Sequence, residues 1–430
     1  MLALSTKIYT NDNFINLLFI TMPLSFIAGN LILNLNILLL LLSAFIFYGT
    51  NIFRIKLHLV DKLMILFFSF ILFTSIYNNI HIYTTEEWPK NFAVTKKAFL
   101  FLRFLALYFI VRYIIKEKKI NFKFFLISCT FCSIFVSLDL FYQFLFGVDI
   151  FGFESNGRKL SGPFGDELIA GGYLQRFSLF AFFLFPIYFI KDKKNLKYIS
   201  ILLFLLFFLA IIISGNRMPL ILFIFSISLI MLLEKNLRKY FIVFLAFFSI
   251  IFLILFNFNS KIKANFINFY HQATKLSTVI TVDKIDKTKM PPYYKEFSTF
   301  YGTWQLNKYI GGGIKGFRYY CHKRKDIDKN SEFICNMHPH NYYLEILAEL
   351  GLVGFIIISS IFLITLYITF VKKYFISSNL NNKQLITPFM FLAMLEMFPI
   401  RSTGSFFTTG NATYIFLVIA IAISLSREKN

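Results

Sequence analysis

The stretch MHPHNYYLEILAELGLVG, residues 337–354, joins a long hydrophilic loop to an apolar run. Leucines recur at helical spacing after His340 and Asn341, so we expect both residues at the N-terminus of a membrane-spanning helix. The free N–H groups and the helix dipole there favour a neutral histidine that can accept a proton. Glu345 and Glu349 could orient or reprotonate it; the alternative is that His340 and Asn341 only cap the helix.

Composition places the chain among integral membrane proteins. Of its 430 residues, 57% are hydrophobic, 60 are Phe and only 15% are charged, whereas a soluble domain is about 25% charged. Apolar runs long enough to cross about 30 Å of hydrocarbon predict an all-α polytopic protein with about twelve spans. These runs are 14–29, 31–50, 63–79, 98–115, 124–147, 168–190, 198–214, 218–233, 240–257, 342–371, 384–399 and 409–426.

Lysine and arginine in the short loops predict the orientation of the chain. With both termini in the cytoplasm, the cytoplasmic segments carry 21 basic residues and the short outward loops carry seven, the asymmetry of the positive-inside rule. A bacterial inner-membrane protein of this kind would have one large periplasmic loop, residues 257–340, with short helices near 262–276 and 293–309. We therefore expect about nine spans in residues 1–256, then the loop, then about three spans in residues 341–430.

The net charge of +22 does not indicate a nucleic-acid partner. Nearly half of the basic residues lie in the predicted cytoplasmic segments, and no nucleic-acid-binding motif is present. The long loop carries fourteen Lys and Arg against six Asp and Glu. A basic outward surface beside the membrane suits an anionic lipid or a diphosphate.

The four cysteines fall into two pairs. Cys129 and Cys132 lie inside an apolar run, where small packed side chains are expected rather than redox or metal chemistry. Cys321 and Cys335 lie in the outward loop, which is an oxidising compartment in a Gram-negative host, so we expect a disulfide between them.

No metal site is expected in the long loop. His322, His338 and His340 share the loop with the two cysteines, but their spacing matches no zinc pattern.

Arginines in unusual positions are candidates for substrate binding. Arg217 lies in SGNRMP, residues 214–219, an abrupt outward break between two apolar runs that the positive-inside rule does not explain. Arg158 lies on a glycine-rich outward turn, and Arg176 follows inside the next span, where burial of a charge is costly without a partner. Arg176 could bind an anion or pair with an acid such as Glu167.

The residues after His340 include two glycines at the spacing of a known sequence motif. His340 and Asn341 are followed by Gly351 and Gly354 in the pattern H-[NSQ]-x9-G-x-x-[GTY]. This pattern resembles the histidine motif of the O-antigen ligase and polymerase superfamily. Three more segments resemble parts of the family pattern: SGNR at 214–217 resembles its arginine turn, and GRKLSGPFGDELIAGGYL at 157–174 and GGGIKGF at 311–317 resemble its glycine segments. Together with the histidine motif they mark a ligase-like region at about 150–420.

The resemblance implies glycosyl transfer at the outer face of the inner membrane, with no metal, ATP or other cofactor. The donor would be a glycan on undecaprenyl diphosphate among the membrane lipids. The acceptor would be the lipid A core oligosaccharide in a ligase, or a second lipid-linked glycan in a polymerase. His340 would be the base on the acceptor hydroxyl and Arg217 a ligand of the donor diphosphate.

One segment departs from the family pattern. Ligases commonly place a second arginine just before a tryptophan early in the long loop, whereas STFYGT precedes Trp304 here. The role of that second arginine could fall to Arg318, Arg158 or Lys295. The alternative from another class is a transporter or flippase of lipid-linked glycan, for which internal repeats or broken helices near mid-membrane would be expected; no repeat is evident.

Overall fold

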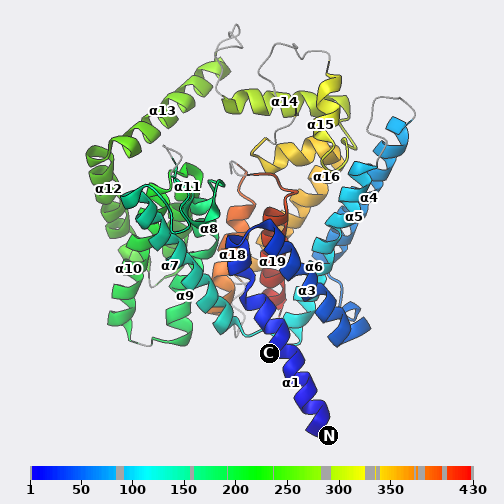
Figure 1. Ribbon diagram of the computed structural model, residues 1–430, viewed down its shortest axis with the longest axis horizontal. Coiled ribbons are helices and arrows are strands. Elements are labelled where there is room, and N and C mark those ends of the chain that lie inside the picture. The colour runs from blue at the N-terminus through cyan, green and yellow to red at the C-terminus, as the bar shows by residue number, and fades with distance from the viewer. Residues whose placement is uncertain are drawn as a thin grey trace. The chain divides into compact units, whose positions relative to one another are not determined.

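Most of the described residues lie in helices. The computed structural model describes residues 2–83, 92–154, 159–190, 192–235, 237–281, 292–324, 335, 339–371, 374–375, 383–399 and 404–427. Over these residues the regular elements are helices (Figure 1), and Val148 and Glu154 form an isolated β-bridge. The predicted all-α class is confirmed.

Eight helical segments of the described chain are long and apolar enough to cross a membrane: Asn30–Phe53, Leu59–Ile80, Ala93–Lys116, Phe122–Phe146, Lys194–Ile213, Arg238–Phe258, Tyr342–Val371 and Thr409–Arg427. Two shorter apolar helices, Arg217–Leu233 and Gln384–Glu396, fall on two further predicted spans. The predicted run at 168–190 is divided at Ser178 into two short helices. The count of twelve spans stays a prediction.

The chain folds into two compact units. The first comprises Met1–Asn16, Asn34–Ile120 and Asp286–Asn430. Its helices are α1 (Leu2–Ile20, up to Asn16), α3 (Asn30–Tyr48, from Asn34), η1 (Gly49–Phe53), α4 (Leu59–Tyr83), α5 (Ala93–Phe101), α6 (Arg103–Lys116), α14 (Pro292–Leu306), α15 (Phe317–Tyr320), η5 (Cys321–Lys323), α16 (Tyr342–Leu366), η6 (Tyr367–Val371), α18 (Lys383–Glu396) and α19 (Thr409–Arg427).

Helix α19 forms the centre of the first unit. Every side chain from 412 to 426 is buried, and the helix packs against α6 and α18. Helix α16 packs against α4 and α14. A buried ion pair between Arg112 and Asp61, with the Tyr108 hydroxyl donating to the same carboxylate (2.7 Å), joins α6 to the start of α4.

The second unit comprises Leu17–Leu33 and Asn121–Ile285. Its helices are α2 (Met22–Ile27), α7 (Phe122–Phe146), η2 (Gly162–Phe164), α8 (Ala170–Phe177), α9 (Leu179–Tyr188), α10 (Lys193–Ile213), α11 (Arg217–Leu233), η3 (Arg238–Tyr240), α12 (Phe241–Phe258) and α13 (Ser260–Thr281). Helix α12 has no buried residue although it is almost entirely apolar, which suits a helix that faces lipid. Helix α13 follows it after one residue (Figure 1).

Candidate functional site

The N-terminus of α16 carries the histidine motif. Asn341 is the N-cap residue, and its side-chain oxygen accepts hydrogen bonds from the backbone N–H groups of Tyr343 (3.0 Å) and Leu344 (3.1 Å). These bonds satisfy two of the amides that a helix leaves unpaired at its start. His340 is half-buried directly before the cap, with φ of +50°, which is uncommon outside glycine. The predicted position of both residues at a helix start is confirmed.

The end of α18 supports this helix start. The Asn341 amide donates to the carbonyl of Pro399 (2.8 Å), and the Tyr343 hydroxyl donates to the carbonyl of Met397. Both acceptors lie just after α18. Asn341, the residue that follows His340, is therefore held both by its own helix and by the segment after α18.

A glycine segment docks into a break in α16. Gly351 has φ of +63° and interrupts the helix. The backbone N–H groups of Gly312 and Gly313 donate to the carbonyls of Ala348 (3.1 Å) and Glu349 (2.7 Å). A Cβ at Gly351 would lie 2.3 Å from the carbonyl of Tyr309. A glycine at position 351 is therefore required by a positive φ and by contact between two backbones.

Polar side chains of α4 and α15 hold the same glycine segment. The Asn78 amide donates to the carbonyl of Gly311 (3.0 Å) and accepts a hydrogen bond from the Tyr320 hydroxyl. Burial raises the pKa of Tyr320 to about 12. The backbone N–H of Ile314 donates to the Ser75 hydroxyl (3.3 Å).

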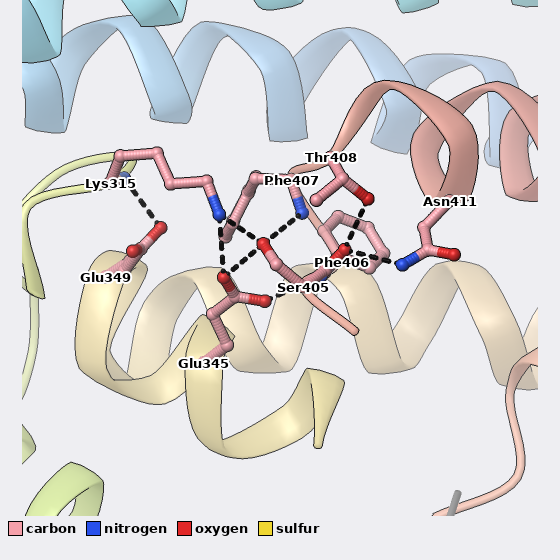
Figure 2. Close-up of polar contacts among 8 residues, drawn as sticks. All are labelled: Lys315, Glu345, Glu349, Ser405, Phe406, Phe407, Thr408 and Asn411. Carbon is pink, nitrogen blue, oxygen red and sulfur yellow. Dashed lines mark hydrogen bonds and ion pairs between the residues drawn. The ribbon is translucent and has the colours of Figure 1, made fainter. Parts of the chain in front are cut away.

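Two buried carboxylates of α16 bind the residue that follows the glycines. Lys315 donates its backbone N–H to Glu349 (2.7 Å) and its ammonium group to Glu345 (3.1 Å) (Figure 2). The Ser405 hydroxyl contacts both the Lys315 ammonium and Glu345, and the backbone N–H of Phe406 donates to Glu345 (2.6 Å). We name Lys315, Glu345, Glu349 and Ser405 the lysine cluster. These carboxylates bind Lys315, Ser405 and Phe406, and a role of Glu345 and Glu349 in orienting or reprotonating His340 stays a prediction.

The turn that presents Ser405 is held by the start of α19. The Thr408 hydroxyl (2.9 Å) and the Asn411 amide (2.8 Å) both donate to the carbonyl of Ser405 (Figure 2). The lysine cluster thus joins three segments that are far apart in the sequence. Sequence reasoning missed Lys315 and Ser405, because neither lies within a few residues of the histidine motif.

A disulfide joins the glycine segment to the chain that leads to His340. Cys321 and Cys335 are bonded, with their Cα atoms 5.5 Å apart. The bridge belongs to a buried apolar cluster in which the rings of Phe300 and Phe317 stack with centroids 3.6 Å apart. Ala348 of α16 packs in the same cluster, so the bridge is anchored on the helix that His340 precedes.

Arg324, three residues after Cys321, lies against α14. Its guanidinium donates to the carbonyl of Thr299 (2.9 Å), and a Cβ added at Gly302 would lie 2.6 Å from its Cζ atom. Gly302 comes two residues before Trp304, in the segment where the ligases' second arginine is missing. Sequence reasoning did not single out Arg324. The available signal was a glycine inside a helical segment, which costs about 1 kcal/mol relative to alanine and so indicates a packing reason.

The other candidates for the second cation lie apart from this contact. Arg318 is exposed on α15, and Lys295 is half-buried in the first turn of α14. Arg158 and His338 lie outside the described residues. Among described residues no group of three His, Cys, Asp or Glu side chains is arranged to hold a metal ion.

The arginine turn belongs to the second unit, whereas His340 belongs to the first. Arg217 is the first residue of α11, and its Nε and Nη2 atoms donate to the side-chain oxygen of Asn265 on α13 (2.9 and 2.6 Å). Its guanidinium carbon lies 5.4 Å from the centroid of the Phe269 ring, within the range of a cation–π contact.

Both sequence segments of this unit that resemble the family meet at the turn. A Cβ at Gly171 would lie 2.6 Å from the Ser214 hydroxyl and 2.7 Å from Cβ of Asn216, so the start of α8 packs directly on SGNR. The backbone N–H of Leu160 donates to the carbonyl of Ser214 (3.3 Å). Arg176 lies half-buried in the last turn of α8.

Comparison with known proteins agrees with the motifs. Residues 202–359 match the family model described as O-antigen ligase, and this range contains Arg217, Arg324, His340 and Gly351. No curated protein matches the chain. The family match confirms the resemblance to the O-antigen ligase superfamily and supports a membrane glycosyltransferase of the ligase or polymerase kind.

Proposed function

We propose that the protein is an O-antigen ligase, which moves a glycan from undecaprenyl diphosphate to the lipid A core oligosaccharide at the periplasmic face of the inner membrane. The observation that carries the proposal is the O-antigen ligase match over residues 202–359, which contains the histidine motif and the arginine turn. In this proposal residues 257–340 form the periplasmic loop and both termini are cytoplasmic, as the positive-inside asymmetry favours.

His340 is the proposed base. The acceptor hydroxyl oxygen attacks the anomeric carbon of the donor sugar, its proton passes to the imidazole of His340, and the bond from that carbon to the diphosphate breaks. The electron pair leaves with undecaprenyl diphosphate. Support comes from the Asn341 cap and the contacts of Asn341 and Tyr343 after α18, since a general base needs a fixed position to be effective.

Arg217 is the proposed ligand of the donor diphosphate. Negative charge grows on the leaving diphosphate, and a fixed guanidinium stabilises it through charge-assisted hydrogen bonds. The contact with Asn265 on a second helix supports this role, because it restricts the orientation of the side chain.

Arg324 is the proposed second cation, in place of the arginine missing before Trp304. Its guanidinium packs on Gly302, within one turn of Trp304, and it lies three residues after the disulfide-bonded Cys321. It is favoured over Arg318 and Lys295 because its guanidinium contacts α14 at Gly302, just before Trp304, where the family pattern places the arginine.

Two alternatives predict different results. A polymerase would use the same His340 chemistry with a lipid-linked acceptor; we favour the ligase because a single large loop lies next to the histidine. A transporter would be expected to have broken helices, and α16 is broken at Gly351. That break is filled by the glycine segment through the hydrogen bonds of Gly312 and Gly313, which favours a structural interruption over a substrate path.

The test is glycan transfer by purified protein in detergent, where no gradient exists. His340→Ala and Arg217→Ala are expected to lower transfer at least about 100-fold at unchanged protein level. The matched controls, His322→Ala and Arg238→Ala, change exposed residues of the same types and should retain transfer. Full transfer by both site variants would refute the proposal. In cells, a deletion that leaves lipid A core bare indicates a ligase, whereas core with a single repeat indicates a polymerase.

A further inference from the structure

One buried amide contacts both the arginine turn and its guanidinium. Asn265 is 5% exposed on α13. Its oxygen accepts from Nε and Nη2 of Arg217, and its nitrogen donates to the carbonyl of Gly215 (3.2 Å). Both ends of the amide are therefore used, and they bind two points of the same turn.

The chemistry of this contact is specific to an amide. A carboxylate at position 265 would also accept the two N–H groups, but it would add a negative charge against the guanidinium and would lack the N–H that Gly215 accepts. A neutral amide orients the guanidinium without cancelling its charge. Because Asn265 accepts hydrogen bonds from Nε and Nη2 of Arg217, it also fixes the orientation of the guanidinium edge that carries Nη1 and Nη2. A guanidinium can bind a phosphate bidentately through that edge.

We propose that Asn265 is a positioning residue that fixes the guanidinium of Arg217 for a diphosphate group while preserving its positive charge. The inference rests on the proposed function, in which Arg217 binds the donor diphosphate. Phe269, one helical turn after Asn265 on α13, supports the guanidinium from its ring face (5.4 Å). Helix α13 therefore supplies both the hydrogen-bond acceptor and the aromatic contact.

The decisive variant is Asn265→Asp, and Asn268→Asp is its matched control. Asn268 is exposed on the same helix, so both variants add one negative charge to α13 and only the first adds it against Arg217. In the detergent assay we expect Asn265→Asp to lower kcat/KM for the lipid-linked donor about tenfold or more, mainly through KM, with its thermal midpoint retained. Inhibition by inorganic pyrophosphate should weaken by a similar factor, whereas Asn268→Asp should behave as wild type in both measurements.

The outcomes separate this inference from the proposed function. If Arg217→Ala abolishes transfer but Asn265→Asp and Asn268→Asp are indistinguishable, the positioning role is overturned and the ligase proposal stands. If Arg217→Ala retains full transfer, the diphosphate role of Arg217 fails and the inference fails with it. If Asn265→Ala and Asn265→Asp lose activity only in proportion to a lowered thermal midpoint and bind pyrophosphate normally, Asn265 is purely structural and the inference is overturned.

Discussion

The ammonium group of Lys315 lies 3.1 Å from the carboxylate of Glu345, and their side chains are 20% and 2% exposed. Thirty residues separate them. One belongs to the glycine segment and the other to the helix that follows His340. The contact therefore connects the two parts of the first unit that carry family motifs, and Ser405 adds a third segment.

Removal of the lysine should destabilise the first unit. Lys315→Met leaves the Glu345 carboxylate buried without its cation, a change that costs about 3–5 kcal/mol. The double variant Lys315→Met with Glu345→Gln should recover part of this loss, since the charge of Glu345 is then removed together with that of its partner. Thermal unfolding in detergent measures both, with the exposed Lys308→Met as control. If Lys315→Met and Lys308→Met unfold at the same temperature, the ion pair between Lys315 and Glu345 does not stabilise the first unit.

Alanine at Gly351 should not be tolerated. Its Cβ would lie 2.3 Å from the backbone of Tyr309, and the φ of +63° disfavours any L side chain. Gly172→Ala is the control, because no atom lies within 4 Å of the added Cβ on helix α8. We expect loss of folded protein in size-exclusion chromatography for Gly351→Ala and a normal profile for Gly172→Ala. A normal profile for both would rule out the backbone contact.

Loss of the disulfide should lower stability. Its two cysteines are separated by 14 residues, and closing a loop of that size is worth about 3 kcal/mol in the chain-entropy model. The double variant Cys321→Ser with Cys335→Ser should unfold at a lower temperature and be insensitive to reductant, whereas the wild type should lose stability when reduced. Mass spectrometry of protein purified without reductant would refute the bridge if both thiols were free.

Gly302→Ala should separate activity from stability. The added Cβ meets the flexible end of Arg324 rather than backbone, so the guanidinium can move away, and alanine is the better helix former by about 1 kcal/mol. We expect an unchanged or higher thermal midpoint together with slower glycan transfer, comparable to that of Arg324→Ala. Undiminished transfer by both variants would exclude Arg324 as the second cation.

Local features of the sequence were sufficient to predict part of the candidate site. An asparagine ahead of an apolar helix predicts an N-cap from a single turn of chain, and Asn341 is that cap. Cys321 and Cys335 were predicted to pair from the compartment expected for their loop, and the two are bonded. The bond from Lys315 to Glu345 could not be predicted in this way, because the lysine comes from another segment.

The sequence by itself determined the all-helical membrane class and the helix start at His340 and Asn341. Hydropathy and capping are properties of neighbouring residues, whereas the need for glycine at position 351 follows from its contact with the backbone of Tyr309 in the folded chain. Only the tertiary structure decided that Lys315 binds Glu345, that Arg324 lies on Gly302, and that Asn265 holds Arg217. These partners are between 22 and 48 residues apart, and their contacts depend on how helices pack, which no local pattern specifies.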